Sequence, residues 1–328
     1  ITPAANGCNG TPIVVVVTVS PKPTVTNTPL LVTRCSNQGP INFTPVMDVA
    51  GSTYTWASSI LGPINPLSVT ASGSGPIVDN PVNVGNGFGT VTYTITPIGP
   101  GGTLCVGTSV NYVVTVNREP VGVNDSKTVC SDDRINYSLL LNVAFLGNGA
   151  GSTFSWLATD NPNPLVTGET TVATIGPSIT DAITNRTSTN QNVVYTVTPT
   201  GTNGCLGAPF LITITIKPEP VGVSTTAPAI CSGSNVNYDL QNNVNTGPGN
   251  GIASNFTWTA VPNPDVSGET TALKSGSMID DVLINTSAVN RTVTYIVTPT
   301  SQTGGCQGDS FTILVDVNPK AIFLAGPN

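Results

Sequence analysis

The stretch VTYIVTP at residues 293–299 recurs earlier in the chain as VTYTITP (91–97) and VVYTVTP (193–199). In each copy, large apolar residues alternate with threonine or another residue. An alternation with a period of two residues is typical of a β-strand with one face buried and the other exposed to solvent. The copies are about 100 residues apart, which indicates a chain built from repeats of that length.

Other motifs recur with the same period. An aromatic–polar–Trp triplet occurs at 54–56, 154–156 and 256–258, and Gly, Pro and Asn clusters separate short alternating runs. No segment has a convincing helical period. We therefore expect an all-β protein of tandem immunoglobulin-like β-sandwich repeats, arranged head to tail. The expected core residues are Trp56, Trp156, Trp258, Tyr93, Tyr195 and Tyr295.

The first aromatic residue of each triplet has two interpretations. Tyr54, Phe154 and Phe256 share a strand face with the tryptophan two residues later, because side chains alternate along a strand. This position favours a core role over a platform on which sugars stack.

Proline-rich segments mark the repeat boundaries, because proline removes a backbone donor and ends a strand. We predict the last strand of a preceding repeat at 1–19, repeats at 20–117, 118–217 and 218–317, and the start of a following repeat at 318–328. The apolar run IVVVVTV (13–19) would then belong to an array that continues upstream. Alternatively, it would be a strand donated to another subunit.

Composition excludes several classes of function. Only 8% of the residues are charged and the net charge is −7, with ten Lys and Arg residues and no basic run, so we expect no nucleic-acid partner. No apolar run approaches the roughly 20 residues that span a bilayer, so we expect no membrane insertion. Seven regularly placed cysteines predict disulfides and hence an oxidising compartment, so we expect an extracellular location, at a cell surface or secreted.

The sequence also argues against catalysis. It contains no histidine, which excludes Ser-His-Asp triads and sites with histidine ligands. Glu169 and Glu269 recur in GETT motifs and could form half of a glycosidase carboxyl pair, although a turn is the favoured interpretation. We expect a protein that is not an enzyme and has no catalytic or cofactor-binding residue.

Recurring carboxylates offer a weak metal candidate. An aspartate is followed four residues later by an asparagine in every repeat, and such short polar side chains commonly cap turns. The alternative is an oxygen-rich calcium site, for which calcium would be the only cofactor. The candidate residues are Asp79, Asp181, Asp281 and the neighbouring Asp280, with Asn83, Asn185 and Asn285 following.

The cysteines allow two pairings. An antibody-type domain bonds its own two cysteines, which would give Cys35–Cys105, Cys130–Cys205 and Cys231–Cys306, with Cys8 left over.

Strand positions argue for the other pairing. Cys130 precedes the strand that begins near Ile135, whereas Cys205 follows the strand that ends near Pro199. The two should therefore lie at opposite ends of a sandwich. A strand of eight residues is about 26 Å long, and a disulfide needs Cα atoms within about 7 Å. Pairing between repeats, Cys35–Cys205 and Cys130–Cys306, is slightly favoured and leaves Cys8 unpaired in this chain.

The order C-S-G-x-x-V-x-Y, F-T-W, V-T-Y-x-V-T-P, G-G-C-x-G and V-x-V-N-P resembles the PKD-like, immunoglobulin-like repeats of very large secreted surface proteins of Bacteroidota. That group includes the giant gliding-motility adhesin exported by the type IX secretion system. The resemblance implies a stalk or filament segment of a repetitive cell-surface adhesin, which gives mechanical extension and surface adhesion. The alternative is a set of carbohydrate- or protein-binding modules accessory to a secreted enzyme.

The same resemblance implies the partners. They are neighbouring repeats of the same long chain, further copies associated laterally or head to tail, and a surface polysaccharide or external substratum.

Overall fold

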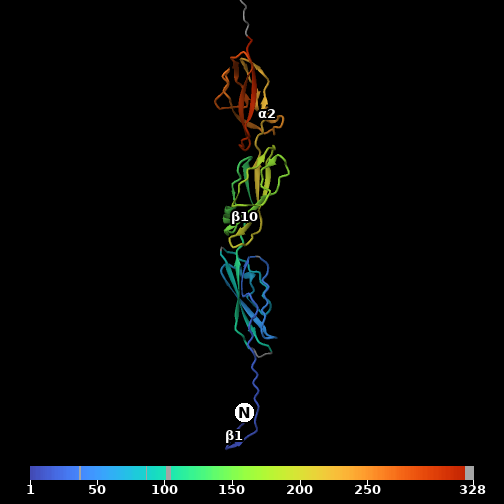
Figure 1. Cartoon of the computed structure of the whole chain (residues 1–328), viewed down its shortest axis with the longest axis vertical. Coiled ribbons are helices and arrows are strands. Elements are labelled where there is room, and N and C mark those ends of the chain that lie inside the picture. The colour runs from blue at the N-terminus through green and yellow to red at the C-terminus, as the bar shows by residue number, and fades with distance from the viewer. Residues whose placement is uncertain (37, 86, 101–104, 322–328) are drawn as a thin grey trace, which may run out of the picture. The chain divides into compact units, whose positions relative to one another are not determined.

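The computed structural model describes residues 1–36, 38–85, 87–100 and 105–321. It confirms the predicted all-β fold, with a β-sandwich in each of the three repeats (Figure 1). Two short strands, β1 (Ala4–Ala5) and β2 (Cys8–Asn9), form a small hairpin before the first repeat.

Repeat 1 is built on a five-stranded sheet with the order β3-β7-β6-β4-β5. The first strand runs parallel to the last, and the other pairs are antiparallel. The elements are β3 (Leu31–Cys35), β4 (Thr53–Leu61), the 3-10 helix η1 (Pro66–Ser68), β5 (Ser72–Gly73), β6 (Gly89–Ile98) and β7 (Val110–Asn117).

Repeat 2 has an equivalent sheet, β12-β10-β15-β16-β8, and two small sheets, β9-β13 and β11-β14. Its strands are β8 (Asp125–Cys130), β9 (Tyr137–Ser138), β10 (Ser152–Ala158), β11 (Val166–Thr167), β12 (Thr174–Ile175), β13 (Ser178–Ile179), β14 (Thr184–Asn185), β15 (Gln191–Gly201) and β16 (Phe210–Lys217).

Repeat 3 divides its first strand into two pieces, which both pair in parallel with the last strand. Its strands are β17 (Thr225–Thr226), β18 (Ile230–Cys231), β19 (Ser234–Asn235), β20 (Tyr238–Asp239), β21 (Ser254–Ala260), β22 (Val266–Ser267), β23 (Lys274–Ser275), β24 (Met278–Ile279), β25 (Val282–Asn285), β26 (Arg291–Ser301) and β27 (Phe311–Asn318).

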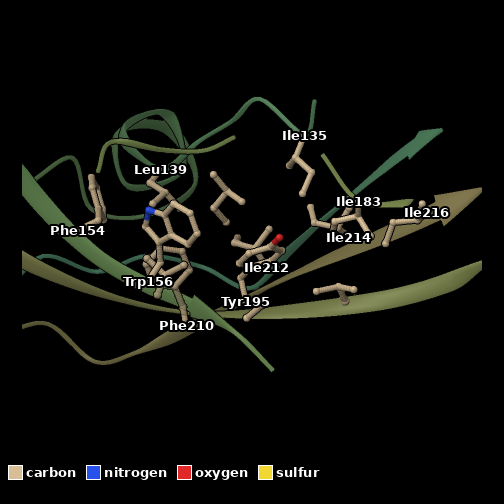
Figure 2. Packing of buried hydrophobic residues seen from close by; sticks show 14 of the residues in the cluster. Ile135, Leu139, Phe154, Trp156, Ile183, Tyr195, Phe210, Ile212, Ile214 and Ile216 are labelled. Carbon is tan, nitrogen blue, oxygen red and sulfur yellow. The ribbon is translucent and has the colours of Figure 1, made fainter. Parts of the chain in front are cut away.

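Each repeat has its own hydrophobic core, and Figure 2 shows that of repeat 2. The tryptophan of the triplet lies buried in every core, in an edge-to-face contact with the tyrosine of the VTY motif. The ring centroids are 5.6 Å apart in repeat 1, 5.7 Å in repeat 2 and 5.6 Å in repeat 3. Phe154 and Phe256 are buried beside their tryptophans, and Tyr54 packs half-buried against its core.

Short helical turns depart from the sequence expectation. The helix α1 (Leu139–Leu141) continues into the π-helical turn η2 (Asn142–Leu146), and α2 (Leu240–Asn245) lies at the same place in repeat 3. Ser138 and Asp239 cap them by accepting backbone N–H bonds. One or two turns are too short to produce a helical period in the sequence.

The predicted strand at 13–19 is also not formed. Ile13 exchanges hydrogen bonds of 2.8 and 2.9 Å with Ile1. Residues 14–19, however, pair with no strand of the described chain, and their valine side chains are exposed. A β-strand exists only where a neighbouring strand accepts and donates its backbone hydrogen bonds.

By its internal contacts the chain divides into two compact units. Unit 1 comprises residues 1–121, 148–152 and 200–207, and unit 2 comprises 122–147, 153–199 and 208–328. One end of repeat 2 thus belongs to the same unit as repeat 1, whereas the rest of repeat 2 forms a unit with repeat 3. No helix among the described residues is long and apolar enough to cross a membrane. The predicted segment 318–328 lies outside the described residues from 322 onward.

Candidate functional site

The recurring aspartates are bound to protein donors. In repeat 1, Asp79 accepts hydrogen bonds from the backbone N–H of Thr70 at 3.0 Å, from the Thr70 hydroxyl at 2.7 Å and from the Tyr93 hydroxyl at 2.6 Å. Burial and the neighbouring Asp79 raise the pKa of Tyr93 well above its ordinary value. The phenol therefore remains a donor throughout the neutral range.

The same network occurs in the other two repeats. Thr170 and Tyr195 donate to Asp181 at 2.7–2.8 Å, and Thr270 and Tyr295 donate to Asp281 at 2.7–3.0 Å. Asp280, the remaining calcium candidate, is exposed and pairs with Lys274, which lowers the pKa of its carboxyl. Each recurring carboxylate thus accepts three hydrogen bonds from protein donors, which indicates a structural role. Among the described residues, no group of three or more Cys, Asp or Glu side chains could hold a metal ion.

The recurring asparagines hold the cysteine that ends the first strand of each repeat. We call Cys35, Cys130 and Cys231 the A-strand cysteines, because they end β3, β8 and β18. After Cys130, the Ser131 N–H donates to Lys217 O at 2.9 Å, and the Asn185 N–H donates to Ser131 Oγ at 2.8 Å. Asn185 Nδ2 also donates to Ile216 O at 2.9 Å. This clamp fixes the cysteine at one end of the sandwich.

The other cysteines lie beyond the strand that carries the VTY motif. We call Cys105, Cys205 and Cys306 the hairpin cysteines, because they follow β6, β15 and β26. The carbonyl of Cys205 accepts the Gly201 N–H at 2.8 Å, and that of Cys306 accepts the Ser301 N–H at 2.8 Å.

Two disulfides join an A-strand cysteine to the hairpin cysteine of the next repeat. Cys35 is bonded to Cys205 with a Cα–Cα distance of 5.6 Å, and Cys130 is bonded to Cys306 at 5.3 Å. This is the pairing that strand position slightly favoured, and the pairing within single repeats is not formed. Cys8, Cys105 and Cys231 are free.

An asparagine ties the linker before repeat 2 to that repeat within unit 1. Asn148 Nδ2 donates to Glu119 O at 2.8 Å, and Asn148 Oδ1 accepts the Val121 N–H at 3.0 Å. Asn250 does the same in repeat 3, with Glu219 O at 2.7 Å and the Val221 N–H at 3.1 Å. The sequence reasoning missed both residues, although each is the centre of a recurring Gly-Asn-Gly motif.

A buried carboxylate distinguishes the linker between repeats 2 and 3. The Glu219 side chain is 3% exposed and lies 3.7 Å from Arg186 Nε, while Arg186 Nη2 pairs with Asp309 at 2.9 Å. Burial raises the pKa of Glu219 to about 8, assisted by a hydrogen bond with Asp132 and the charges of Asp132 and Asp309, and Arg186 opposes the shift. At the corresponding positions of the preceding repeat pair, Val84 and Ala208 replace Arg186 and Asp309.

The GETT glutamates have a local role. Glu169 accepts the Asn161 N–H at 3.0 Å, and Glu269 accepts the Asn263 N–H at 3.2 Å. Each bond joins the GETT segment to the loop that follows the tryptophan strand, which is a local structural contact rather than a four-residue turn.

The PKD-like domain family matches residues 32–120, 127–220 and 228–321. The chain belongs to this family. No curated protein matches it. The PKD-like repeats are similar to the titin Ig domains I67–I69 in an E-to-A variant, with 13% identity and a TM-score of 0.34 over 93% of this chain and 100% of that one.

Two further solved structures resemble the PKD-like array at 13% identity. The human desmocollin-1 ectodomain has a TM-score of 0.24 over 92% of this chain, which spans 59% of its length. The SGBP-B protein of a Bacteroides ovatus mixed-linkage glucan utilization locus, in complex with a heptasaccharide, has a TM-score of 0.20 over 90% of this chain and 71% of that one. Likenesses at these TM-scores carry no functional information. Tandem PKD-like domains are typical of extracellular adhesive or binding modules, and disulfides form and persist outside the reducing cytosol.

Proposed function

We propose that this chain is a non-enzymatic, extracellular stalk or filament segment of a large cell-surface adhesin, and that its disulfides limit its extension under load. The interleaved pairing Cys35–Cys205 and Cys130–Cys306 carries the proposal. Each bond reaches past a repeat boundary, so the distance to which two neighbouring repeats can be drawn apart is limited unless a covalent bond breaks. We include surface adhesion, gliding motility and export by the type IX secretion system in this proposal. The reason is that the order of the repeat motifs resembles that of the adhesins named above.

The covalent path sets the maximal extension. In the oxidised chain, the shortest path from Cys35 to Cys306 uses both disulfides and the stretch between Cys130 and Cys205. At about 3.3–3.6 Å per residue, these roughly 75 residues extend to about 260 Å. Without disulfides the same two points are separated by roughly 270 residues and about 930 Å.

Force spectroscopy on the whole chain, pulled from its termini, tests the role. We expect fully unfolded lengths that differ by about 670 Å between oxidised and reduced molecules, since the segments outside Cys35 and Cys306 add equally to both. The variant Cys130→Ser/Cys306→Ser, which keeps one disulfide, should extend to about 350 Å between these points. Equal lengths with and without reductant would exclude the disulfides as limiters of extension.

Accessory binding modules are the other class of function. A row of exposed aromatic side chains on a sheet would favour that role, as a surface on which sugars stack. The recurring tryptophans and tyrosines lie in the cores instead, so the mechanical role has the stronger support. Glycan-array binding by the intact chain, without a change on reduction, would favour the modules.

A further inference from the structure

The free Cys231 has the same backbone setting as the two bonded A-strand cysteines. Cys231 pairs with Asn318 of β27 in the parallel register that joins Cys35 to Asn117 and Cys130 to Lys217. The sequence Cys-Ser follows each first strand at this point.

The clamp behind Cys231 is also complete. The Ser232 N–H donates to Asn318 O at 2.9 Å, and the Asn285 N–H donates to Ser232 Oγ at 3.0 Å. Asn285 Nδ2 donates to Val317 O at 2.8 Å. These bonds reproduce those that hold Cys130, so Cys231 is fixed as a bonded A-strand cysteine is fixed.

The free Cys105 has the setting of a bonded hairpin cysteine. Its carbonyl accepts the Gly99 N–H at 2.9 Å, and the Gly107 N–H donates to Pro97 O at 2.9 Å, as the Gly308 N–H does to Pro299 O. The incoming chain crosses this end of the repeat closely. A Cβ at Gly107 would lie 1.9 Å from Pro23 O, and one at Gly308 would lie 2.0 Å from Pro220 O.

The free and the bonded cysteines differ in exposure. Cys205 and Cys306 are 0% and 1% exposed once bonded, whereas Cys105 is half-buried and Cys231 is exposed. Cys8 provides a contrast. It shares the Gly-Cys-x-Gly motif of Cys205 and Cys306, but it lies exposed in the two-residue strand β2, which pairs with β1.

We propose that Cys231 and Cys105 are complementary half-sites, and that two copies of this chain join head to tail through a disulfide between Cys231 of one copy and Cys105 of the other. The bonded pairs of the same molecule show that an A-strand cysteine and a hairpin cysteine of this family fit each other. The pairing rests on that geometry, independently of the mechanical role.

The oxidant is a small-molecule disulfide such as oxidised glutathione. The thiolate of Cys105 or Cys231 attacks it, releases one glutathione thiolate and forms a mixed disulfide. The thiolate of the other cysteine then displaces the second glutathione. One protein disulfide forms, one glutathione disulfide is reduced to two thiols, and the two protons of the cysteines pass to those thiols.

The test uses the 328-residue chain with its two disulfides intact, incubated with oxidised and reduced glutathione. We expect a ladder of oligomers on non-reducing gels, and peptide mapping should find the Cys231–Cys105 link at least tenfold more often than Cys231–Cys8 or Cys231–Cys231. Cys231→Ser and Cys105→Ser should each abolish the ladder, whereas Cys8→Ser should leave it unchanged.

Mixing the two single variants gives a sharper control. Cys231→Ser retains Cys105 and Cys105→Ser retains Cys231, so a mixture of the two should form covalent dimers and nothing longer. Failure to form these dimers, or a Cys231–Cys8 link as frequent as Cys231–Cys105, would overturn the proposal. Neither result would bear on the length measured by force.

Discussion

At the scale of single residues, the buried Asp–Tyr hydrogen bond is the clearest recurring contribution to stability. Tyr93→Phe removes the donor that lies 2.6 Å from Asp79 and leaves a buried carboxylate with one partner fewer. We expect a loss of about 1–3 kcal/mol in the free energy of unfolding, measured with urea. Tyr54→Phe, at a half-buried ring of the same repeat, is the matched control and should change it by less than about 0.5 kcal/mol.

Glu219 gives a pH dependence with a definite sign. Its pKa is about 8 in the folded chain against an ordinary 4.5. Between these values the folded state binds more protons than the unfolded state, so this residue makes stability fall as pH rises from about 4.5 to 8.

Glu219→Gln tests that sign, because glutamine stays neutral. Near pH 4.5 the variant and the parent should be similarly stable, since the folded parent is protonated there. At pH 8 the variant should be the more stable by about 4 kcal/mol, as judged by urea unfolding. Parallel pH profiles for the two proteins would contradict the assignment.

At the scale of elements, the sequence was informative where a period of two residues extends over a long strand. The strands β6, β15 and β26, and the tryptophan strands β4, β10 and β21, follow from alternation alone. The helices α1 and α2 were missed because one or two turns carry no period. Residues 13–19 pair with no described strand of this chain, so their assignment to a preceding repeat stays a prediction: a continuous apolar run does not say which strand will pair with it.

Among the site residues, too, some could be predicted from the sequence and others could not. The cysteine pairing could be argued from strand ends, because two cysteines at opposite ends of one sandwich are too far apart to bond. Asn148 and Asn250 were missed, because the recurring Gly-Asn-Gly motif does not show that their side chains bind backbone groups of the linker.

The linker also depends on a close approach of glycine to an aromatic ring. A Cβ at Gly222 would lie 2.2 Å from Cδ1 and Cε1 of Phe311, a core residue of repeat 3. Gly222→Ala should therefore cost about 1–3 kcal/mol, because the ring must move within a filled core. In Gly276→Ala, where the nearest atom is 4.0 Å away, the unfolding free energy should change little. Equal urea midpoints for the two variants would contradict the tight packing of the Phe311 ring against Gly222.

At the scale of the whole molecule, the two disulfides interleave. The loops closed by Cys35–Cys205 and Cys130–Cys306 share the stretch from Cys130 to Cys205, so most of repeat 2 lies inside both. A chain crosslinked in this way has a restricted unfolded state, and each long loop contributes to stability chiefly through lost chain entropy. Low charge on the surface makes this contribution nearly independent of salt, unlike one built from exposed ion pairs.

Removing the disulfides should therefore destabilise the repeats in steps. We expect Cys130→Ser/Cys306→Ser to lower the free energy of unfolding by about 2–4 kcal/mol, and a reductant to lower that of the parent chain further, since it opens both loops. Cys105→Ser/Cys231→Ser is the matched control: it removes the same number of thiols, but neither residue is bonded within the chain. Its urea midpoint should equal that of the monomeric parent chain with both internal disulfides intact. A loss as large as that of the bonded pair would mean that cysteine packing, rather than the crosslink, stabilises the repeats.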